Sequence, residues 1–416
     1  MSTVHVVGAG LAGLATAAAL IARGARVVVY EAAGQAGGRC RSYYDAALDC
    51  VIDNGNHLVL SGNPAVRQYL HTVGAESALA GPERAEFSFV DLTSGARWTV
   101  RPSEGPLPGW IFDSRRRVPG TAAWDYAKLV PLLIAGRSQR IADLIPCQGP
   151  LWQRFVRPLL LAALNTEPEN ASAALAAAVL RQTLAKGGRA YRPRIASPNL
   201  AAAFVEPALR FLAAGEGMIH LGQRLRRIAL DADRVAALEF PENTVPVSRG
   251  DTVVLATPPW IAQDLLPAVP APIEFHAIVN AHFRIAPPRG APAMLGVIGG
   301  IAEWIFAFAE RISVTVSAAD AIVDREREAL ARTLWADVAR ALDLPEALPP
   351  WQIVKEKRAT FAATPEQAAR RPRAATAWRN LFLAGDWIDT GLPATIESAL
   401  RSGQKAAQLA YAGAPV

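Results

Sequence analysis

Few residues in this sequence are of the kinds that build metal centres or disulfide frameworks. Only three cysteines and six histidines are present among 416 residues, and the spacing of Cys40, Cys50 and Cys147 matches no metal-ligand pattern. We therefore expect no metal site, and we expect thiols that stay reduced, as they do in the cytosol.

Long apolar runs and concentrated charge are also lacking. Hydrophobic residues make up 51% of the chain, yet no uninterrupted apolar run is long enough to span a bilayer. The densest stretch, 291–309, predicts two strands around a glycine turn. The net charge of +6 is modest and the arginines are scattered, which argues against a nucleic-acid partner. A strand at 4–7 leaves no room for a signal peptide, so we expect cytoplasmic residence.

The N-terminal segment carries a glycine-rich motif between that strand and an alanine-rich helix. The motif consists of Gly8, Ala9, Gly10, Leu11, Ala12 and Gly13. Gly8 permits a tight turn, Gly10 lets the backbone approach a pyrophosphate, and Gly13 lets the helix pack against the strand. Glu31 ends the next strand, where an acid accepts hydrogen bonds from a ribose. This order of elements predicts a dinucleotide site rather than an accidental glycine turn.

A second glycine pair, Gly37 and Gly38, is followed by Arg39. It resembles the G-G-R element of the flavin amine oxidase and phytoene desaturase superfamily, where that element passes under the pyrophosphate and flavin of FAD. The alternative is an ordinary glycine loop with a solvated arginine. The resemblance implies FAD as the cofactor. We expect non-covalent binding, because a cysteinyl flavin near the C-terminus is excluded when every cysteine lies before Pro150.

Near the C-terminus, a buried strand is predicted to end at Gly385 and Asp386, and a helix follows. A helix N-terminus carries free amides and partial positive charge, so it can face an anionic group. By resemblance to the superfamily, Asp386 contacts the ribityl and phosphate region. Ala394, Thr395 and Ile396 would then begin a helix at the pyrimidine end of the flavin. The alternative is a surface β-α unit.

The resemblance extends over nearly the whole chain. Leu225 lies in a predicted strand pair and best matches the position that meets adenine through backbone atoms. We expect an α/β fold, with a discontinuous Rossmann-type FAD-binding domain of the GR2-like kind and an inserted α+β substrate domain. The FAD-binding domain would comprise residues 1–65, 200–265 and 370–416. The substrate domain would comprise residues 66–199 and 266–369.

Four further segments resemble one particular group within this superfamily. One contains Asn54, Gly55, Asn56 and His57 in a loop expected to face the flavin. The others are the helical stretch 160–180, the strand 303–306 after a glycine turn, and residues 392–399. Together they resemble the hydroxysqualene dehydroxylases of bacterial hopanoid synthesis. Carotenoid desaturases share the C-terminal motif, so the middle segments carry the distinction.

Such an enzyme converts hydroxysqualene, an allylic alcohol on a long isoprenoid, to squalene and water. Loss of the hydroxyl leaves an allylic cation, which reduced FAD supplies with hydride. The site needs a proton donor and dry apolar walls. His57 is the candidate acid; the alternative, which we favour, is a histidine that only hydrogen-bonds the flavin or the backbone. The electron donor is not identified.

Other functions on the same fold stay open. A carotenoid-type desaturase or an amine oxidase would keep the same FAD motifs. A non-catalytic lipid carrier, similar to prenyl-protein escort proteins, would have abandoned the flavin. Residues 110–145 mix aromatic and apolar residues with cations, which suits an interfacial helix on anionic lipid at the inner face of the cytoplasmic membrane. An ordinary amphipathic helix packed on its own domain explains the pattern equally well.

Overall fold

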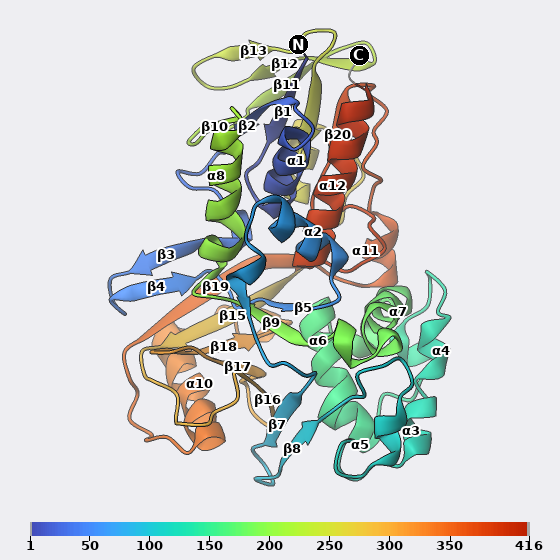
Figure 1. The fold of residues 1–416 in the computed structure, drawn as a ribbon, viewed down its shortest axis with the longest axis vertical. Coiled ribbons are helices and arrows are strands. Elements are labelled where there is room, and N and C mark those ends of the chain that lie inside the picture. The colour runs from blue at the N-terminus through green and yellow to red at the C-terminus, as the bar shows by residue number, and fades with distance from the viewer. Residues whose placement is uncertain (1, 414–416) are drawn as a thin grey trace.

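The computed structural model describes residues 2–413. Figure 1 shows an upper part, which holds both termini, above a broader lower part. The long strand β19 (Trp351–Phe361) runs across the middle of the molecule, close to where the two parts meet. The mixed α/β architecture confirms the predicted fold class.

A parallel sheet forms the centre of the upper part, with the strand order β10-β2-β1-β14-β20. Its strands are β1 (Thr3–Val7), β2 (Arg26–Tyr30), β10 (Met218–His220), β14 (Thr252–Leu255) and β20 (Leu381–Leu383). The three central strands are valine-rich and mostly buried, as expected for parallel strands covered on both faces. Segments distant in the sequence therefore end side by side at one edge of this sheet.

Helices α1 (Leu11–Ile21) and α12 (Ile396–Gly413) lie against the sheet. Helix α2 (Pro64–Thr72) packs on both of these helices, and helix α8 (Glu206–Ala214) packs on α1. The alanine-rich helix predicted after the glycine motif is confirmed as α1. It packs tightly against α12, because a Cβ atom at Gly403 would lie 2.3 Å from the carbonyl oxygen of Ala12. The N-terminal and C-terminal segments are thus fixed against each other.

Three small sheets flank the centre. They contain the hairpin β3 (Ser42–Asp45) and β4 (Cys50–Asp53), the strands β5 (Leu58–Leu60), β6 (Leu79–Ala80) and β9 (Pro193–Ala196), and the strands β11 (Arg227–Asp231), β12 (Arg234–Glu239) and β13 (Thr244–Pro246). The expected strand pair is present as β11 and β12, but the first strand begins only at Arg227, so the placement of Leu225 within it is wrong: Leu225 lies just before β11.

The lower part is built on a seven-stranded sheet with the order β19-β15-β18-β17-β16-β7-β8. Besides β19, its strands are β7 (Phe87–Asp91), β8 (Arg97–Val100), β15 (Phe275–Phe283), β16 (Met294–Ile298), β17 (Trp304–Ala307) and β18 (Ile312–Val316). The two strands expected in 291–309 are confirmed as β16 and β17. Helix α10 (Arg327–Leu342) covers one face, where its Trp335 meets Phe283.

The other face of this sheet packs against helices. These are α3 (Ala123–Ala127), α4 (Val130–Leu133), α5 (Gly149–Leu151), α6 (Arg157–Leu164) and α7 (Ala173–Gln182), while α9 (Pro259–Leu265) and α11 (Pro365–Ala369) lie at the junction with the upper part. Phe155, in a π-helical turn that continues into α6, contacts Phe89 of the sheet at 6.1 Å between ring centroids. The helical stretch predicted at 160–180 is confirmed as α6 and α7.

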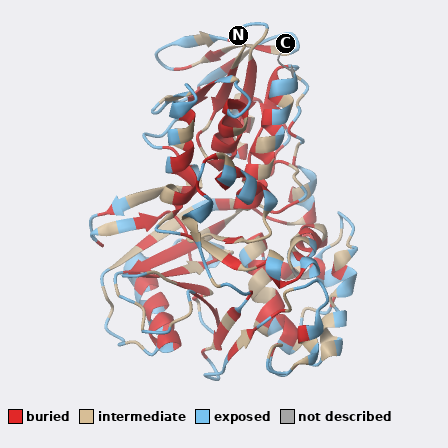
Figure 2. Cartoon of the chain, viewed as in Figure 1, coloured by how far each residue is buried: buried red, intermediate tan, exposed pale blue. Residues whose placement is uncertain are grey.

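The prediction of an interfacial helix in residues 110–145 is wrong. The structure has only short helical turns there, including α3 and α4. Pro119, Gly120, Pro131 and Gly136 interrupt this segment, and proline and glycine break helices by removing a donor or by adding backbone freedom. Figure 2 shows these turns as a mixture of buried and exposed residues. Among residues 2–413, no helix combines the length and the apolar character needed to cross a membrane.

Candidate functional site

The N-terminal glycines form a tight junction at the end of β1. A Cβ atom at Gly13 would lie 1.9 Å from the carbonyl oxygen of Gly8, so only glycine allows α1 to approach the strand this closely. Gly10 differs, because no atom of a neighbouring residue lies within 4 Å of its would-be Cβ. The backbone at Gly10 therefore borders open space, as a pyrophosphate cradle at the N-terminus of α1 requires. Leu11 and Ala12 are buried in the first turn of that helix.

Glu31 lies beside this cradle, directly after β2. Its Oε2 accepts a hydrogen bond from the Ala9 amide at 2.7 Å, and its Oε1 accepts one from the Ala33 amide at 2.8 Å. The backbone carbonyl of Glu31 also accepts from the amide of Gln223 at 2.8 Å. This last bond brings the segment of Leu225, which is buried, next to the acid. The predicted ribose and adenine contacts are therefore neighbours in space.

The second glycine element lies on the first. Gly37 and Gly10 form a parallel β-bridge, and the Gly37 amide donates to the carbonyl of Ala9 at 2.8 Å. A Cβ atom at Gly38 would lie 3.3 Å from Cα of Gly10. The two glycine motifs, separated by more than twenty residues in the sequence, thus make one continuous loop surface at the sheet edge.

Arg39 connects this loop to two distant segments. Its Nη2 donates to Oδ1 of Asp386 at 2.7 Å, and its Nη1 donates to the carbonyl oxygen of Ala359 on β19. The guanidinium lies deep in the molecule, yet 39% of the side-chain surface stays accessible. Arg39 is therefore not the solvated arginine of the alternative interpretation. It pairs with a carboxylate and with a backbone carbonyl of distant segments.

The C-terminal element completes the same edge. Gly385 follows β20, and its amide donates to Oγ of Ser402 on α12 at 2.8 Å. Ala394 and Thr395 are half-buried just before Ile396 begins α12, and Oγ1 of Thr395 accepts from the amide of Ser398 at 3.1 Å. The start of α12 thus lies beside Asp386, because Oγ of Ser398 donates to the Asp386 carbonyl at 3.4 Å.

A buried arginine that the sequence did not single out holds this turn. Arg371 donates through Nη2 and Nε to the backbone carbonyls of Asp386 and Trp387 at 3.4 and 3.3 Å. Burial lowers its pKa to about 10, while the carboxylates of Asp389 and Asp386 oppose that shift. The guanidinium therefore stays charged at neutral pH and satisfies carbonyls that would otherwise be buried without partners.

The loop from Asn54 to His57 lies against the seven-stranded sheet. Asn56 donates through Nδ2 to Oγ1 of Thr315 at 3.1 Å, and Thr315 donates to Oδ1 of Asn280 at 2.8 Å. A Cβ atom at Gly55 would lie 3.1 Å from Nδ2 of Asn280. Sequence reasoning missed Asn280 and Thr315. The signal in the sequence was Asn280 itself, an asparagine within a largely apolar strand, β15. Asn280 is 2% exposed.

Two buried oxygens at this edge have no hydrogen-bond partner among the described residues. They are Oδ1 of Asn56 and Oγ1 of Thr257, which follows β14. Buried polar atoms in folded proteins nearly always have a partner. A polar cofactor along the glycine loops, Asp386 and the Asn56 loop would supply one. The residues present therefore fit FAD.

His57 lies among these groups and is uncharged at neutral pH. Burial, then repulsion from Arg39, lowers its pKa to about 4, and Asp386 opposes the shift without cancelling it. A neutral imidazole can donate or accept a hydrogen bond but holds no extra proton to give. This favours the interpretation in which His57 orients the cofactor or the backbone, and its role stays a prediction.

Apolar residues form the wall beside the Asn56 loop. Trp304 and Phe306 on β17 share a sheet face with Thr315, because Trp304 pairs with Thr315 in the β17–β18 register. Leu160 and Leu164 of α6 belong to the same buried cluster as these aromatic rings. Their exposed fractions are only 1–5%, so the wall is a tightly packed apolar surface.

One carboxyl group stands at the edge of this wall. Glu303 precedes Trp304 and accepts a hydrogen bond through Oε2 from the Ser317 amide at 2.8 Å. Burial raises its pKa to about 7, and Glu167 adds to the rise, while Ser317 and Arg157 oppose it. A group that is half protonated near neutral pH can act as a general acid. The sequence marked Glu303 only as part of a family motif.

Comparison with known proteins agrees with this geometry. The family model described as "Flavin containing amine oxidoreductase" matches residues 11–410. The fold is shared with a solved structure of cyclohexylamine oxidase from Brevibacterium oxydans, with a TM-score of 0.76 and 16% identity over 99% of both chains. The chain belongs to the flavin-containing amine oxidoreductases. It is a flavin-dependent oxidoreductase, and FAD is the flavin that its dinucleotide motif fits.

Relatives narrow the class further. The hydroxysqualene dehydroxylase of Rhodopseudomonas palustris is 55% identical over 99% of this chain and 98% of its own length. The hydroxysqualene dehydroxylase of Sinorhizobium fredii is 52% identical over 98% of both. Within the flavin family, the chain is therefore a member of the hydroxysqualene dehydroxylases, and the resemblance found in the sequence motifs is confirmed.

The glycine cradle makes a prediction about cofactor binding. Gly10→Val should abolish FAD binding, because the valine would occupy the space over the backbone that a pyrophosphate needs. Gly34→Val is the matched control, since Gly34 also has no neighbouring atom within 4 Å of its would-be Cβ but is not in either motif. Flavin content is measured by absorbance after purification. Full flavin occupancy in the Gly10 variant would show that the pyrophosphate lies elsewhere.

The low pKa of His57 makes a prediction about pH. The folded protein resists protonating His57 until about pH 4, whereas an unfolded histidine binds its proton near pH 6.5. This contribution to stability is therefore complete above pH 6.5 and is lost as the pH falls toward 4. Urea unfolding of the holoenzyme should show a weaker acid destabilisation for His57→Gln than for wild type. The control is His71→Gln, since the His71 side chain is 81% exposed. This variant should show the same acid destabilisation as wild type.

Proposed function

We propose that this protein removes the hydroxyl group of hydroxysqualene reductively, giving squalene and water. The observation that carries the proposal is the combination of a polar dinucleotide cradle with an apolar wall at the Asn56 loop. Membership of the hydroxysqualene dehydroxylases supports this substrate over the amines or carotenoids of other branches. A lipid carrier without flavin is not favoured, since the residues of the cradle are all in place.

The proposed cofactor contacts follow the geometry of the sheet edge. Gly8 to Gly13, Gly37 and Gly38 would hold the pyrophosphate, Glu31 the ribose, and the backbone at Leu225 the adenine. Asp386 and Arg39 would hold the ribityl region, and the start of α12 would face the pyrimidine ring. We propose that binding is non-covalent and that residues 1–65, 200–265 and 370–416 form the FAD-binding domain. Bound there in its reduced form, FAD would supply the hydride for the carbon that loses oxygen.

The protein's own residues would then prepare the leaving group. Trp304, Phe306 and the leucines of α6 exclude water from the hydrocarbon chain, which keeps a carbocation from being captured by water. Departure of the hydroxyl as water requires a proton. Glu303 has a pKa suited to that task, and His57 does not hold a proton at neutral pH. The two side chains are therefore the candidates to compare.

The substrate is tested by anaerobic turnover. Dithionite-reduced holoenzyme is mixed separately with hydroxysqualene, phytoene and a panel of amines, and products are identified by mass spectrometry. We expect squalene from hydroxysqualene and no reaction with the others. When the flavin is reduced with a deuteride donor in deuterated buffer, so that exchange at the flavin does not remove the label, one deuterium should appear on the carbon that lost oxygen. Product from an amine or from phytoene, with none from hydroxysqualene, would overturn the proposal.

The proton donor is tested in the same single-turnover assay. Glu303→Gln should slow reoxidation of the reduced flavin by hydroxysqualene roughly 10²–10⁴-fold, the typical contribution of a positioned acid. It should also remove the loss of rate that wild type shows above about pH 7. His57→Gln should retain the pH profile. If instead His57→Gln lost the rate while keeping its FAD, His57 would be the acid.

A second part of the proposal concerns the bilayer in which such a substrate resides. Several large apolar side chains are exposed on the turns between residues 107 and 134. They are Leu107, Phe112, Trp124, Val130 and Ile134, exposed by 82, 74, 78, 55 and 84%. Arg115 lies in the same segment and Arg137 just after it, both with side chains 88% exposed and with ion pairs to Asp113 and Asp389. We propose that this surface rests on the inner face of the cytoplasmic membrane.

The geometry explains why the contact would be shallow. The turns are not one amphipathic helix, and Trp110 and Leu132 point into the core as anchors, with 5 and 0% exposure. Trp124 lies between these anchors and Ile134 follows the second one, and both are exposed. Isolated apolar tips on short turns insert at the headgroup level, where tryptophan is favoured and arginine meets anionic lipid.

This surface predicts binding to vesicles. Ile134→Ala and Trp124→Ala should each weaken co-sedimentation with phosphatidylglycerol vesicles roughly tenfold, because burying such a side chain contributes about 1.5–3 kcal/mol. Leu230→Ala is the matched control, since Leu230 is exposed by 44% on β11, outside the segment. Equal sedimentation of all three variants with wild type would contradict a membrane contact here.

A further inference from the structure

Reductive removal of a hydroxyl consumes two electrons in each turnover. If the proposed function holds, those electrons must come from a carrier that is not the substrate. The wall beside the Asn56 loop is apolar and suits a hydrocarbon. Soluble two-electron carriers are planar heterocycles joined to phosphate groups, so such a carrier needs a different, cationic surface near the cofactor.

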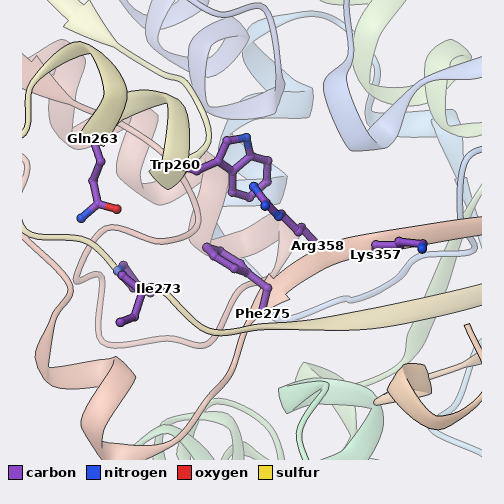
Figure 3. A pocket seen from close by; sticks show the side chains of 7 residues that line it. Trp260, Gln263, Ile273, Phe275, Lys357 and Arg358 are labelled. Carbon is purple, nitrogen blue, oxygen red and sulfur yellow. The ribbon is translucent and has the colours of Figure 1, made fainter.

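One pocket in the described part of the chain has that character. It has a volume of about 400 Å³ and lies between α9, the start of β15 and the end of β19. Figure 3 shows Trp260 and Phe275 beside the guanidinium of Arg358, with Gln263 and Ile273 on the facing rim. We propose that this pocket binds a phosphate-bearing redox nucleotide that delivers the electrons.

Arg358 is the central group of the pocket. Its guanidinium carbon lies 5.0 Å from the ring centroid of Trp260 and 5.9 Å from that of Phe275. The two rings pack edge to face at 5.1 Å. No carboxylate among residues 2–413 forms an ion pair with Arg358, whereas the neighbouring Lys357 is paired with Asp324 at 2.6 Å. The rings thus hold an uncompensated cation in place, which is the arrangement that anion recognition uses.

The pocket lies beside the proposed flavin contacts. Arg358 immediately precedes Ala359, whose carbonyl oxygen accepts the hydrogen bond from Arg39. Strand β19 therefore carries the pocket's cation and the anchor of the flavin loop on consecutive residues. A ligand at Arg358 would therefore lie on the strand that also anchors the loop that we assign to the cofactor.

The pocket is shallow and open, and the chemistry of its lining suits a small ligand. Its volume lies in the range of small-molecule sites, and it stands at the junction of the two parts of the fold, where such sites are common. Indole and phenyl rings offer faces for a planar heterocycle, and Arg358 offers a partner for phosphate. Flavin and nicotinamide nucleotides share this chemistry.

The electron balance is simple for either source. A reduced flavin nucleotide loses two electrons and two protons, and the bound cofactor gains both. A reduced nicotinamide nucleotide loses two electrons and one proton, and solvent supplies the second proton. Neither case requires any further oxidant or reductant.

The test measures binding to the FAD-saturated holoenzyme by equilibrium dialysis. The probes are FMN, NADPH and inorganic phosphate, each offered to wild type, Arg358→Gln, Trp260→Leu and Arg249→Gln. Arg249 is exposed in a loop of the upper part and serves as the matched control. We expect FMN or NADPH to bind wild type and the control, and to bind the Arg358 and Trp260 variants at least tenfold more weakly, the usual scale for losing a charged hydrogen bond.

Several results would overturn the proposal. One is the absence of nucleotide binding to wild type, and another is equal binding to Arg358→Gln. Phosphate that binds as tightly as both nucleotides would exclude a role for the rings. Reduction of the holoenzyme by an acidic electron-transfer protein, with no response to nucleotides, would assign the surface to a protein. Because no arm uses hydroxysqualene, failure here is distinguishable from failure of the proposed function.

Discussion

The ion pair between Arg39 and Asp386 is the interaction on which the site depends. It joins a loop near the N-terminus to the turn before the last helix, and the same guanidinium reaches the carbonyl of Ala359 on β19. Three segments distant in sequence thus meet at one side chain. Asp386 is only 7% exposed, whereas 39% of the Arg39 side chain stays accessible, so the ion pair is partly screened by solvent. The bond from Arg39 to Ala359 links this part of the molecule to the sheet of the lower part.

Around this point the structure separates three chemical environments. The glycine loops and the start of α12 form a polar cradle with backbone amides and open space at Gly10. The face of β17 and β18 that adjoins the Asn56 loop is lined by aromatic and aliphatic side chains, with Glu303 at its edge. The outer end of β19 presents Arg358 between two rings. Cofactor, hydrocarbon and electron carrier need these three environments, and the strand β19 places all of them within one sheet and its neighbours.

Local patterns in the sequence predict the residues of the cradle but not the residues that complete it. The glycine motif and Glu31 were predictable because their spacing reflects backbone geometry within one βαβ unit. The turn at Asp386 was predictable because a local strand-turn-helix pattern surrounds it. Asn280, Thr315 and Arg371 were not, since each acts through contacts with residues more than ten positions away. The prediction of a helix in residues 110–145 was wrong because it rested on composition. The prolines and glycines in this segment interrupt helical structure. The neutral state of His57 depends on burial and on Arg39, neither of which its own segment reveals.

A double-mutant cycle on Arg39 and Asp386 tests the account most directly. FAD dissociation constants are measured for Arg39→Ala, Asp386→Ala and the double variant by flavin titration of each apoprotein. If the pair organises the cofactor site, each single change weakens FAD, and the double change costs less than the sum, with a coupling energy of 0.5–3 kcal/mol. Additive effects, or single variants that bind FAD as tightly as wild type, would contradict the claim that this contact builds the site.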